Sequence, residues 1–166
     1  MKALIVSAPL FEDSELLVPY YRLLEEGMET QVASLEKGSI RGKHGYEVEA
    51  VDLADINGQE YDLLILPGGK APITLRASRA LLELVGGFMA QGKTVAAICH
   101  GPLILAAAGV LAGRRLTGHR SVARDIEWAG ANYQDESVVV DGNLITSRQP
   151  HDLPDFMREI IKRCRS

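Results

Sequence analysis

The feature that most restricts the fold of this sequence is a series of short apolar runs separated by helical patterns. Three such runs occupy residues 3–6, 63–66 and 94–98. Each run is too short for a helix and lacks the alternation of a half-exposed strand, so each predicts a strand buried on both faces. Residues 17–24 and 81–88, which lie between the runs, place apolar side chains at helical spacing. Strands that alternate with helices predict crossover connections and a mostly parallel sheet covered on both faces.

The remaining segments add elements around this sheet. Residues 30–35 are expected to form another strand, residues 38–50 a turn-rich hairpin, and residues 138–140 and 144–147 the two arms of a hairpin around Asp141-Gly142-Asn143. Further helices are expected over residues 103–111, 121–129 and 153–161. We find no internal repeat and no linker, and therefore expect one α/β domain over residues 1–166, built as a three-layer sandwich.

Charge and apolar content exclude several classes of protein. The chain has 18 Lys and Arg against 22 Asp and Glu, a formal net charge of −4, with no basic run. Such a charge provides no surface for a nucleic acid or an anionic membrane. No apolar run approaches the roughly 20 residues of a membrane-spanning helix, and the apolar stretch near the start is too short for a signal peptide. Cys99 and Cys164 match neither a disulfide framework nor a zinc motif. We expect a cytoplasmic protein with reduced thiols.

The residues with the clearest chemistry are Cys99 and His100, because a buried strand turns there into a helix. This is the setting of a nucleophile elbow, in which Gly101 would let the turn close against the helix. The start of the helix is expected to lower the pKa of the Cys99 thiol, and His100 to serve as base and proton shuttle. The alternatives are a buried cysteine that acts only as a small apolar residue and a histidine that points away from it.

Two other segments follow predicted strands and should meet the elbow at the same edge of the sheet. Pro67-Gly68-Gly69 brings a backbone amide, and the N–H groups of Gly69 and His100 would form an oxyanion hole, unless the glycines only make a turn. After the first strand, Glu15 is the candidate to enter the site, with Glu12 either supporting it or only complementing the helix dipole. We expect no metal and no cofactor, because the histidines lack metal-ligand spacing and no phosphate-binding loop is present.

Five segments in fixed order resemble the PfpI-type intracellular protease family of the ThiJ/PfpI superfamily, and they span nearly the whole chain. The resemblance implies a flavodoxin-like sandwich and assembly as a homodimer or a hexamer. It also implies that Cys99 is the nucleophile, that His100 is its neighbour, that Glu15 lies against the thiol, and that the amides of Gly69 and His100 form the oxyanion hole. The segments are FEDSELLVPYYRL, LPGGKAP, VAAICHGP, AGVLAGRRLT and VVVDGNLITSRQPHDLPDFMRE.

Two positions depart from the protease-like members. The resemblance implies a glutamate after Pro72 that completes a triad in a neighbouring subunit, but Ile73 stands there and cannot orient an imidazole. His119 occupies a position where the human parkinsonism-associated member also has a histidine. His119 is therefore either a second acid/base group or a surface histidine.

The resemblance implies glyoxalase and deglycase activities, and with Cys99, His100 and Glu15 present it favours a cofactor-free enzyme that uses Cys99 to act on reactive dicarbonyls or early glycation adducts, as a deglycase or a glutathione-independent glyoxalase. Its partners would be a small carbonyl or glycated substrate and further copies of itself. The first alternative is an intracellular cysteine peptidase, which the missing glutamate disfavours. The second is a stress-response sensor or holdase in which Cys99 is oxidised to a sulfinic acid stabilised by Glu15.

Overall fold

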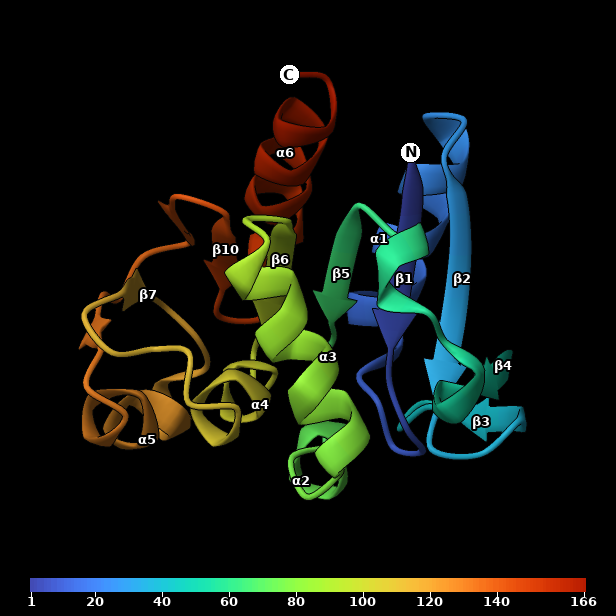
Figure 1. Ribbon diagram of the computed structural model, residues 1–166, viewed down its shortest axis with the longest axis horizontal. Coiled ribbons are helices and arrows are strands. Elements are labelled where there is room, and N and C mark those ends of the chain that lie inside the picture. The colour runs from blue at the N-terminus through green and yellow to red at the C-terminus, as the bar shows by residue number, and fades with distance from the viewer.

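A computed structural model describes residues 1–166 as one eight-stranded sheet with helices on both sides and a small two-stranded sheet beside it (Figure 1). The strand order is β3-β4-β2-β1-β5-β6-β10-β9, and only the edge pairs β3–β4 and β10–β9 are antiparallel. The strands are β1 (Lys2–Val6), β2 (Glu29–Ser34), β3 (Gly38–Arg41), β4 (Glu47–Asp52), β5 (Leu63–Leu66), β6 (Thr94–Ile98), β9 (Val138–Asp141) and β10 (Leu144–Ser147), with β7 (Arg115–Leu116) and β8 (Asn132–Tyr133) in the small sheet.

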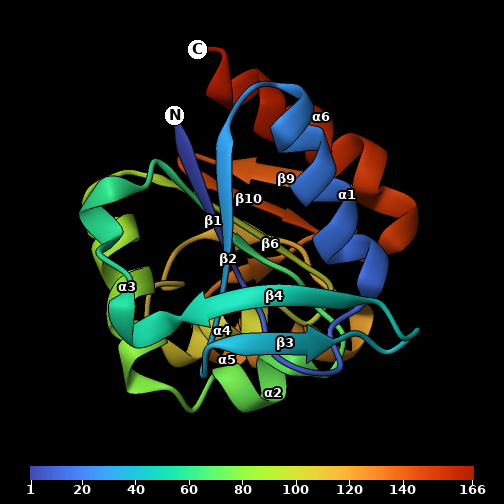
Figure 2. The ribbon, with the colours of Figure 1, turned by 90° about the vertical axis from the view of Figure 1, so that its right-hand side faces the viewer.

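The helices lie in two layers. Helices α1 and α6 contact each other on one face of the sheet, and α3 packs on the opposite face next to α4 (Figure 2). The helices are α1 (Asp13–Glu25), α2 (Ala71–Leu75), α3 (Arg79–Ala90), α4 (Pro102–Ala107), α5 (Ala123–Trp128) and α6 (Leu153–Cys164), with single turns η1 (Leu53–Asp55), η2 (Gly58–Glu60), η3 (Arg120–Val122) and η4 (Pro150–Asp152). The predicted α/β sandwich with a mostly parallel, flavodoxin-like sheet is confirmed.

The central strands β1, β5 and β6 form the middle of the core. Every residue of β5 and the residues 3–6 of β1 are buried, as the continuous apolar runs predict. Strand β1 pairs with β2 on one side and with β5 on the other. The chain therefore adds β2 and β4 on one side of β1 and then β5 and β6 on the other side, so the strand order reverses at β1. In open parallel sheets, ligands bind beyond the carboxyl ends of the strands at such a reversal. The segments after β1, β5 and β6 meet at this place.

The structure differs from the sequence-based expectations in peripheral elements. The helix expected over residues 103–111 ends at Ala107, because Gly109 adopts a positive φ of 70° and ends the turn. Helix α2 and the β7–β8 pair have no counterpart in the prediction, since five helical residues and two-residue strands are too short to repeat a hydrophobic pattern.

Candidate active site

The site is organised around the turn between β6 and α4. Cys99 is buried and has a positive φ of 62°, a backbone conformation that side chains other than glycine rarely adopt. Its N–H donates to the carbonyl oxygen of Ser147 at 3.0 Å, which ties the turn to β10. A Cβ atom at Gly101 would overlap the carbonyl oxygen of Leu66 and lie 3.0 Å from that of Ile98. The expected elbow is therefore present, and the glycine permits the close approach of β5 and β6.

Glu15 reaches the thiol from the first turns of α1. Its side chain is fully buried, and its Oε1 accepts a hydrogen bond from the N–H of Gly68 at 3.0 Å, whereas Oε2 is buried without a hydrogen-bond partner. Burial raises the pKa of Glu15 to about 8, although the bond from Gly68 opposes the shift. A Cβ atom at Gly68 would lie 2.6 Å from both Glu15 and Cys99. At neutral pH Glu15 is thus a neutral carboxylic acid packed against the sulfur.

The thiol does not have the lowered pKa that the elbow predicts. Burial and then the charge of Glu15 raise the pKa of Cys99 to about 12, while the backbone N–H groups of Gly69 and His100 lower it. The prediction of a lowered pKa is therefore wrong. Helix α4 has only six residues. Burial in this apolar turn destabilises the thiolate more than hydrogen bonds from two amides stabilise it. Cys99 consequently needs a base to remove its proton.

His100 is placed to be that base. Its Nδ1 lies 3.1 Å from the sulfur of Cys99, and the ring is half-buried. Burial, followed by the charges of His119 and Lys43, lowers the pKa of His100, so the ring is neutral at physiological pH. The ring of His119 stacks on it with centroids 4.7 Å apart and planes inclined by 20°. The structure therefore brings His119 into the site.

Ser121, which sequence reasoning missed, bridges the two histidines. Its Oγ lies 3.1 Å from Nε2 of His100 and 2.7 Å from Nδ1 of His119. An exposed serine in a loop carries no sequence signal by itself. The only available indication was its position two residues after His119.

Glu12 is held at the rim by Lys43 and His44. Its carboxylate lies 3.0 Å from Nζ of Lys43 and 3.1 Å from Nε2 of His44, and Glu12 is the residue directly before α1. Asp13 next to it is buried and accepts from the N–H groups of His44 and Tyr46, which fixes the loop that carries Lys43. Glu12 thus lies in the site without touching the sulfur, and Lys43 is a second residue that sequence reasoning did not identify.

These groups line a pocket of about 490 Å³. Ile73 from α2 stands at its mouth with 53% of its surface exposed, where the resemblance implied a glutamate in the related proteases. Within the chain no carboxylate side chain hydrogen-bonds His100. The residues that line the pocket are Glu12, Glu15, Lys43, Gly69, Lys70, Ile73, Cys99, His100, His119, Gln149 and Pro150.

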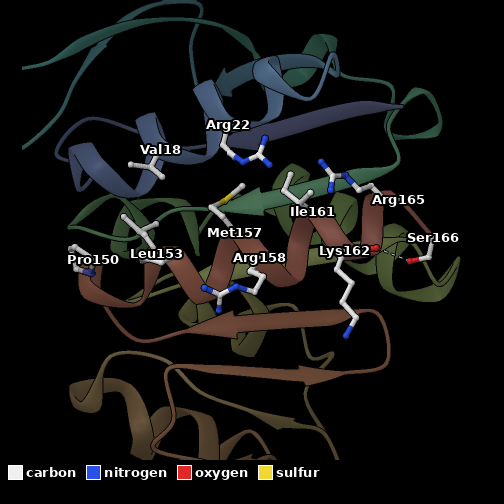
Figure 3. A pocket seen from close by; sticks show the side chains of 11 residues that line it. Val18, Arg22, Pro150, Leu153, Met157, Arg158, Ile161, Lys162, Arg165 and Ser166 are labelled. Atoms are coloured by element: carbon white, nitrogen blue, oxygen red, sulfur yellow. Dashed lines mark hydrogen bonds between the residues drawn. The ribbon is translucent and has the colours of Figure 1, made fainter.

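A larger groove, of about 1020 Å³, lies elsewhere, between α1 and α6 (Figure 3). Its floor includes Leu153, Met157 and Ile161, and its sides carry arginine and lysine side chains. The groove contains no cysteine and no histidine, so we assign the chemistry to the smaller pocket at the elbow.

Other candidates lie outside the site. Cys164 is a half-buried residue of α6, and its pKa is raised by burial. No group of three or more His, Cys, Asp or Glu side chains is placed to hold a metal ion. No helix combines the length and the apolar content needed to cross a membrane.

Comparison with known proteins identifies relatives along the whole chain. The family model described as "DJ-1/PfpI family" matches residues 1–163. A protein of Pyrococcus furiosus named "Deglycase PfpI" is 50% identical over 164 residues, and the match covers 98% of each chain. General stress protein 18 of Bacillus subtilis is 42% identical over 164 residues, with 96% of this chain and 95% of that protein covered.

Solved structures give the same result. A two-domain protein from Anabaena variabilis, with DJ-1/ThiJ/PfpI-like and ferritin-like domains, superposes with a TM-score of 0.97 at 37% identity, covering 99% of this chain and 50% of that one. DJ-1beta of Drosophila melanogaster superposes with a TM-score of 0.89 at 30% identity, covering 98% of this chain and 89% of that one. On sequence and fold together, this chain belongs to the DJ-1/PfpI family.

Proposed function

We propose that this chain is a cysteine-dependent enzyme that acts on reactive dicarbonyls or early glycation adducts without a cofactor. The observation that carries the proposal is the contact of the Cys99 sulfur with Nδ1 of His100 at 3.1 Å, beside the neutral carboxyl group of Glu15. A nucleophile, a base and a neutral hydrogen-bond donor are the groups that addition to an aldehyde requires. Relatives about 50% identical to this chain are named deglycases, which supports the same reaction class.

The first step forms a hemithioacetal. The proton of the Cys99 thiol passes to Nδ1 of His100, and the sulfur attacks the aldehyde carbon of the substrate. The C–S bond forms while the C=O double bond becomes a single bond to an oxyanion. The free N–H groups of Gly69 and His100, which already face the sulfur, stabilise that oxyanion until the imidazolium returns its proton.

The second step moves hydrogen within the substrate. A proton leaves the former aldehyde carbon, and another reaches the neighbouring carbonyl carbon, so the first carbon is oxidised and the second reduced with no external electron acceptor. His100 or His119 carries these protons. The resulting thioester is cleaved by water, which releases a 2-hydroxy acid such as lactate and regenerates the Cys99 thiol. With an early adduct of an amine or thiol, the Cys99 sulfur instead replaces that group at the former aldehyde carbon, and the repaired amine or thiol leaves with the proton that His100 took from the Cys99 thiol, which gives the same hemithioacetal.

One side-by-side assay tests the proposal. Methylglyoxal, an early methylglyoxal adduct of an amino acid or thiol, and a fluorogenic peptide are each given to the wild type and to Cys99→Ala. We expect 2-hydroxy acid release from the carbonyl substrates that falls by at least about 100-fold in Cys99→Ala, as for loss of a nucleophile. Cys164→Ala, which removes the other thiol, is the matched control and should retain full activity. Turnover that persists in Cys99→Ala contradicts the proposal.

The peptidase alternative predicts a different result in the same assay. Ile73 lies at the mouth of the pocket and supplies no carboxylate to orient His100. We expect weak peptide cleavage by the wild type and a gain in Ile73→Glu if a neighbouring subunit brings this position to the site. Efficient wild-type cleavage of peptides, with no gain in Ile73→Glu, favours the peptidase.

The sensor alternative predicts modification without turnover. The buried Glu15 carboxyl group lies next to the sulfur and would donate a hydrogen bond to a sulfinate at Cys99. Mass spectrometry after mild peroxide distinguishes this reading, which requires oxidation of Cys99 before Cys164 together with no product from any of the three substrates.

A further inference from the structure

Four side chains form a continuous row of hydrogen bonds that begins at the thiol. Cys99 Sγ lies 3.1 Å from Nδ1 of His100, whose Nε2 lies 3.1 Å from Oγ of Ser121. The same Oγ lies 2.7 Å from Nδ1 of His119. Ser121 is thus the partner of the imidazole nitrogen that faces away from the nucleophile. In hydrolases with a catalytic triad this position belongs to a carboxylate.

The direction of each hydrogen bond follows from one backbone group. The N–H of Ser121 donates to Nδ1 of His119 at 3.2 Å, so this nitrogen carries no proton. The Ser121 hydroxyl, 2.7 Å from the same nitrogen, therefore donates its own proton to it. The lone pairs of the Ser121 oxygen then face His100 and accept from its Nε2–H.

We propose that Ser121 is a positioning residue that holds His100 in the tautomer with a proton on Nε2 and a bare Nδ1 facing the Cys99 thiol. In this tautomer Nδ1 can accept the thiol proton at once. In the opposite tautomer an N–H would point at the S–H group, and no proton could be taken up. The role of Ser121 in turnover rests on the proposed function, whereas its control of the tautomer does not.

The turn that carries Ser121 is fixed to the elbow before any substrate binds. The N–H of His119 donates to the carbonyl oxygen of Cys99 at 2.8 Å, and the hydroxyl group of Tyr133 donates to the carbonyl oxygen of Gly118 at 3.0 Å. The side chain of His119 caps the η3 turn through the N–H of Ser121. The distance between the serine and His100 is therefore set by contacts that fix the two residues just before the turn.

Ser121 differs from a carboxylate partner in that it is neutral. It can select the tautomer and the ring orientation of His100, but it cannot stabilise an imidazolium ion by charge. Burial is the main cause of the lowered pKa of His100, with contributions from His119 and then Lys43, and the carboxyl groups of Glu12 and Glu15 line the same pocket. The basicity of His100 is thus set by burial and by its electrostatic surroundings, and its orientation by Ser121.

The test separates orientation from stability. We would compare the wild type with Ser121→Ala, with Ser121→Thr, which keeps the hydroxyl group, and with Ser39→Ala, an exposed serine on strand β3 that serves as control. The first readout is the pair of ¹⁵N chemical shifts of the His100 ring at a pH where the ring is neutral. We expect one tautomer, with Nε2 protonated, in the wild type, Ser121→Thr and Ser39→Ala, and a mixture of tautomers in Ser121→Ala.

The second readout is the rate at which iodoacetamide alkylates Cys99 as a function of pH, measured by mass spectrometry of the Cys99 peptide. In Ser121→Ala we expect the rate near pH 7 to fall about tenfold, as for loss of one neutral hydrogen bond, with recovery in Ser121→Thr. The turnover of the carbonyl substrates should fall by a similar factor.

An unchanged tautomer and an unchanged alkylation rate in Ser121→Ala would overturn the proposal. A wild type that turns over none of the substrates contradicts the proposed function alone, because the ¹⁵N shifts and the alkylation rate do not depend on the substrate. Unequal unfolding temperatures among the variants leave the tautomer readout valid, since it is measured on folded protein.

Discussion

The buried carboxyl group of Glu15 and the thiol of Cys99 share a space that tolerates only one negative charge. Burial raises the pKa of both groups, and the charge of Glu15 raises the pKa of Cys99 further, whereas a hydrogen bond with Cys99 lowers the pKa of Glu15. Glu15 therefore keeps its proton at neutral pH, and the charge that appears during the reaction can form on the sulfur. The same proton allows Glu15 to donate a hydrogen bond to the sulfur.

This arrangement predicts the behaviour of Glu15→Gln. Glutamine is a neutral mimic of the protonated carboxyl group, with an oxygen for the N–H of Gly68 and an NH₂ group for the sulfur. Near pH 7 we expect Cys99 in this variant to be alkylated at a rate within about threefold of the wild type. Above pH 8, where Glu15 ionises, Cys99 of the wild type should be alkylated about tenfold more slowly than Cys99 of the variant.

The measurement is the pH dependence of iodoacetamide alkylation, carried out in a Cys164→Ala background so that only one thiol reacts. A Glu15→Gln variant that is slower than the wild type throughout the pH range would show that Glu15 acts on the sulfur as an anion.

At the scale of single residues, chain position predicted part of the site. Cys99, Glu15 and Gly69 follow three different strands, and parallel strands bring their carboxyl ends to one edge, so their meeting was predictable. Ser121 and Lys43 come from loops, whose path depends on contacts such as Asp13 with the N–H of His44. Those contacts leave no hydrophobic pattern in the sequence. The pKa of Cys99, which burial raises and backbone N–H groups lower, cannot be predicted from sequence either.

At the scale of elements, the elbow depends on how closely α4 and β6 approach β5. A methyl group at Gly101 would overlap the backbone carbonyl of Leu66, which cannot move without disturbing the sheet. We expect Gly101→Ala to lower the free energy of unfolding by about 2–4 kcal/mol and to displace Cys99 from His100. Urea unfolding and the alkylation rate at pH 7 measure the two effects.

Gly86→Ala is the matched control for that substitution. Gly86 lies inside α3, has an ordinary φ, and a Cβ atom there meets nothing within 4 Å. Alanine is a better helix former than glycine, so the free energy of unfolding of this variant should exceed that of the wild type by up to about 1 kcal/mol. Equal stabilities for the two variants would show that the elbow adapts to a side chain at Gly101.

Elements were predictable in proportion to their length and periodicity. The buried strands and the helices α1, α3 and α6 repeat their pattern over several residues, and Ser78 caps α3 by accepting from the N–H of Leu81. Helix α2 and strands β7 and β8 are defined by tertiary contacts alone. Helix α4 ended early because the conformation of a single glycine, Gly109, outweighed an apolar run that continues to Leu111.

At the scale of the whole molecule, the ionisation of Glu15 couples the site to global stability. The carboxyl group ionises near its ordinary pKa of 4.5 in the unfolded chain but at about 8 in the folded one. Between these values the folded state holds a proton that the unfolded state has lost, so the free energy of unfolding falls as pH rises from about 4.5 to 8. For a fully buried group this loss is on the order of 4 kcal/mol.

Other groups make stability rise with pH, His100 within this range and two carboxyl groups below it. The lowered pKa of His100 means that the folded state releases a proton that the unfolded state still holds, so His100 contributes a gain in stability as pH rises through about 6.5. Glu26 and Asp141, whose pKa values are lowered by arginine partners and a backbone bond, act only in acid, where protonation removes their contribution. A pH profile of the wild type alone therefore mixes these effects.

The difference between Glu15→Gln and the wild type isolates the contribution of Glu15, because every other group is common to both proteins. The amide cannot ionise, so at pH 8 the variant should unfold at a higher urea concentration, by a free energy of about 2–4 kcal/mol, and at pH 4.5 the two curves should nearly coincide. The advantage should grow steadily between these pH values and level off above pH 9, where Glu15 is ionised in both states. A difference that is constant with pH would mean that Glu15 ionises at the same pH in the folded and unfolded chains. The carboxyl group beside Cys99 would then be an anion at neutral pH. The thiol would have to lose its proton next to that negative charge, which disfavours the thiolate.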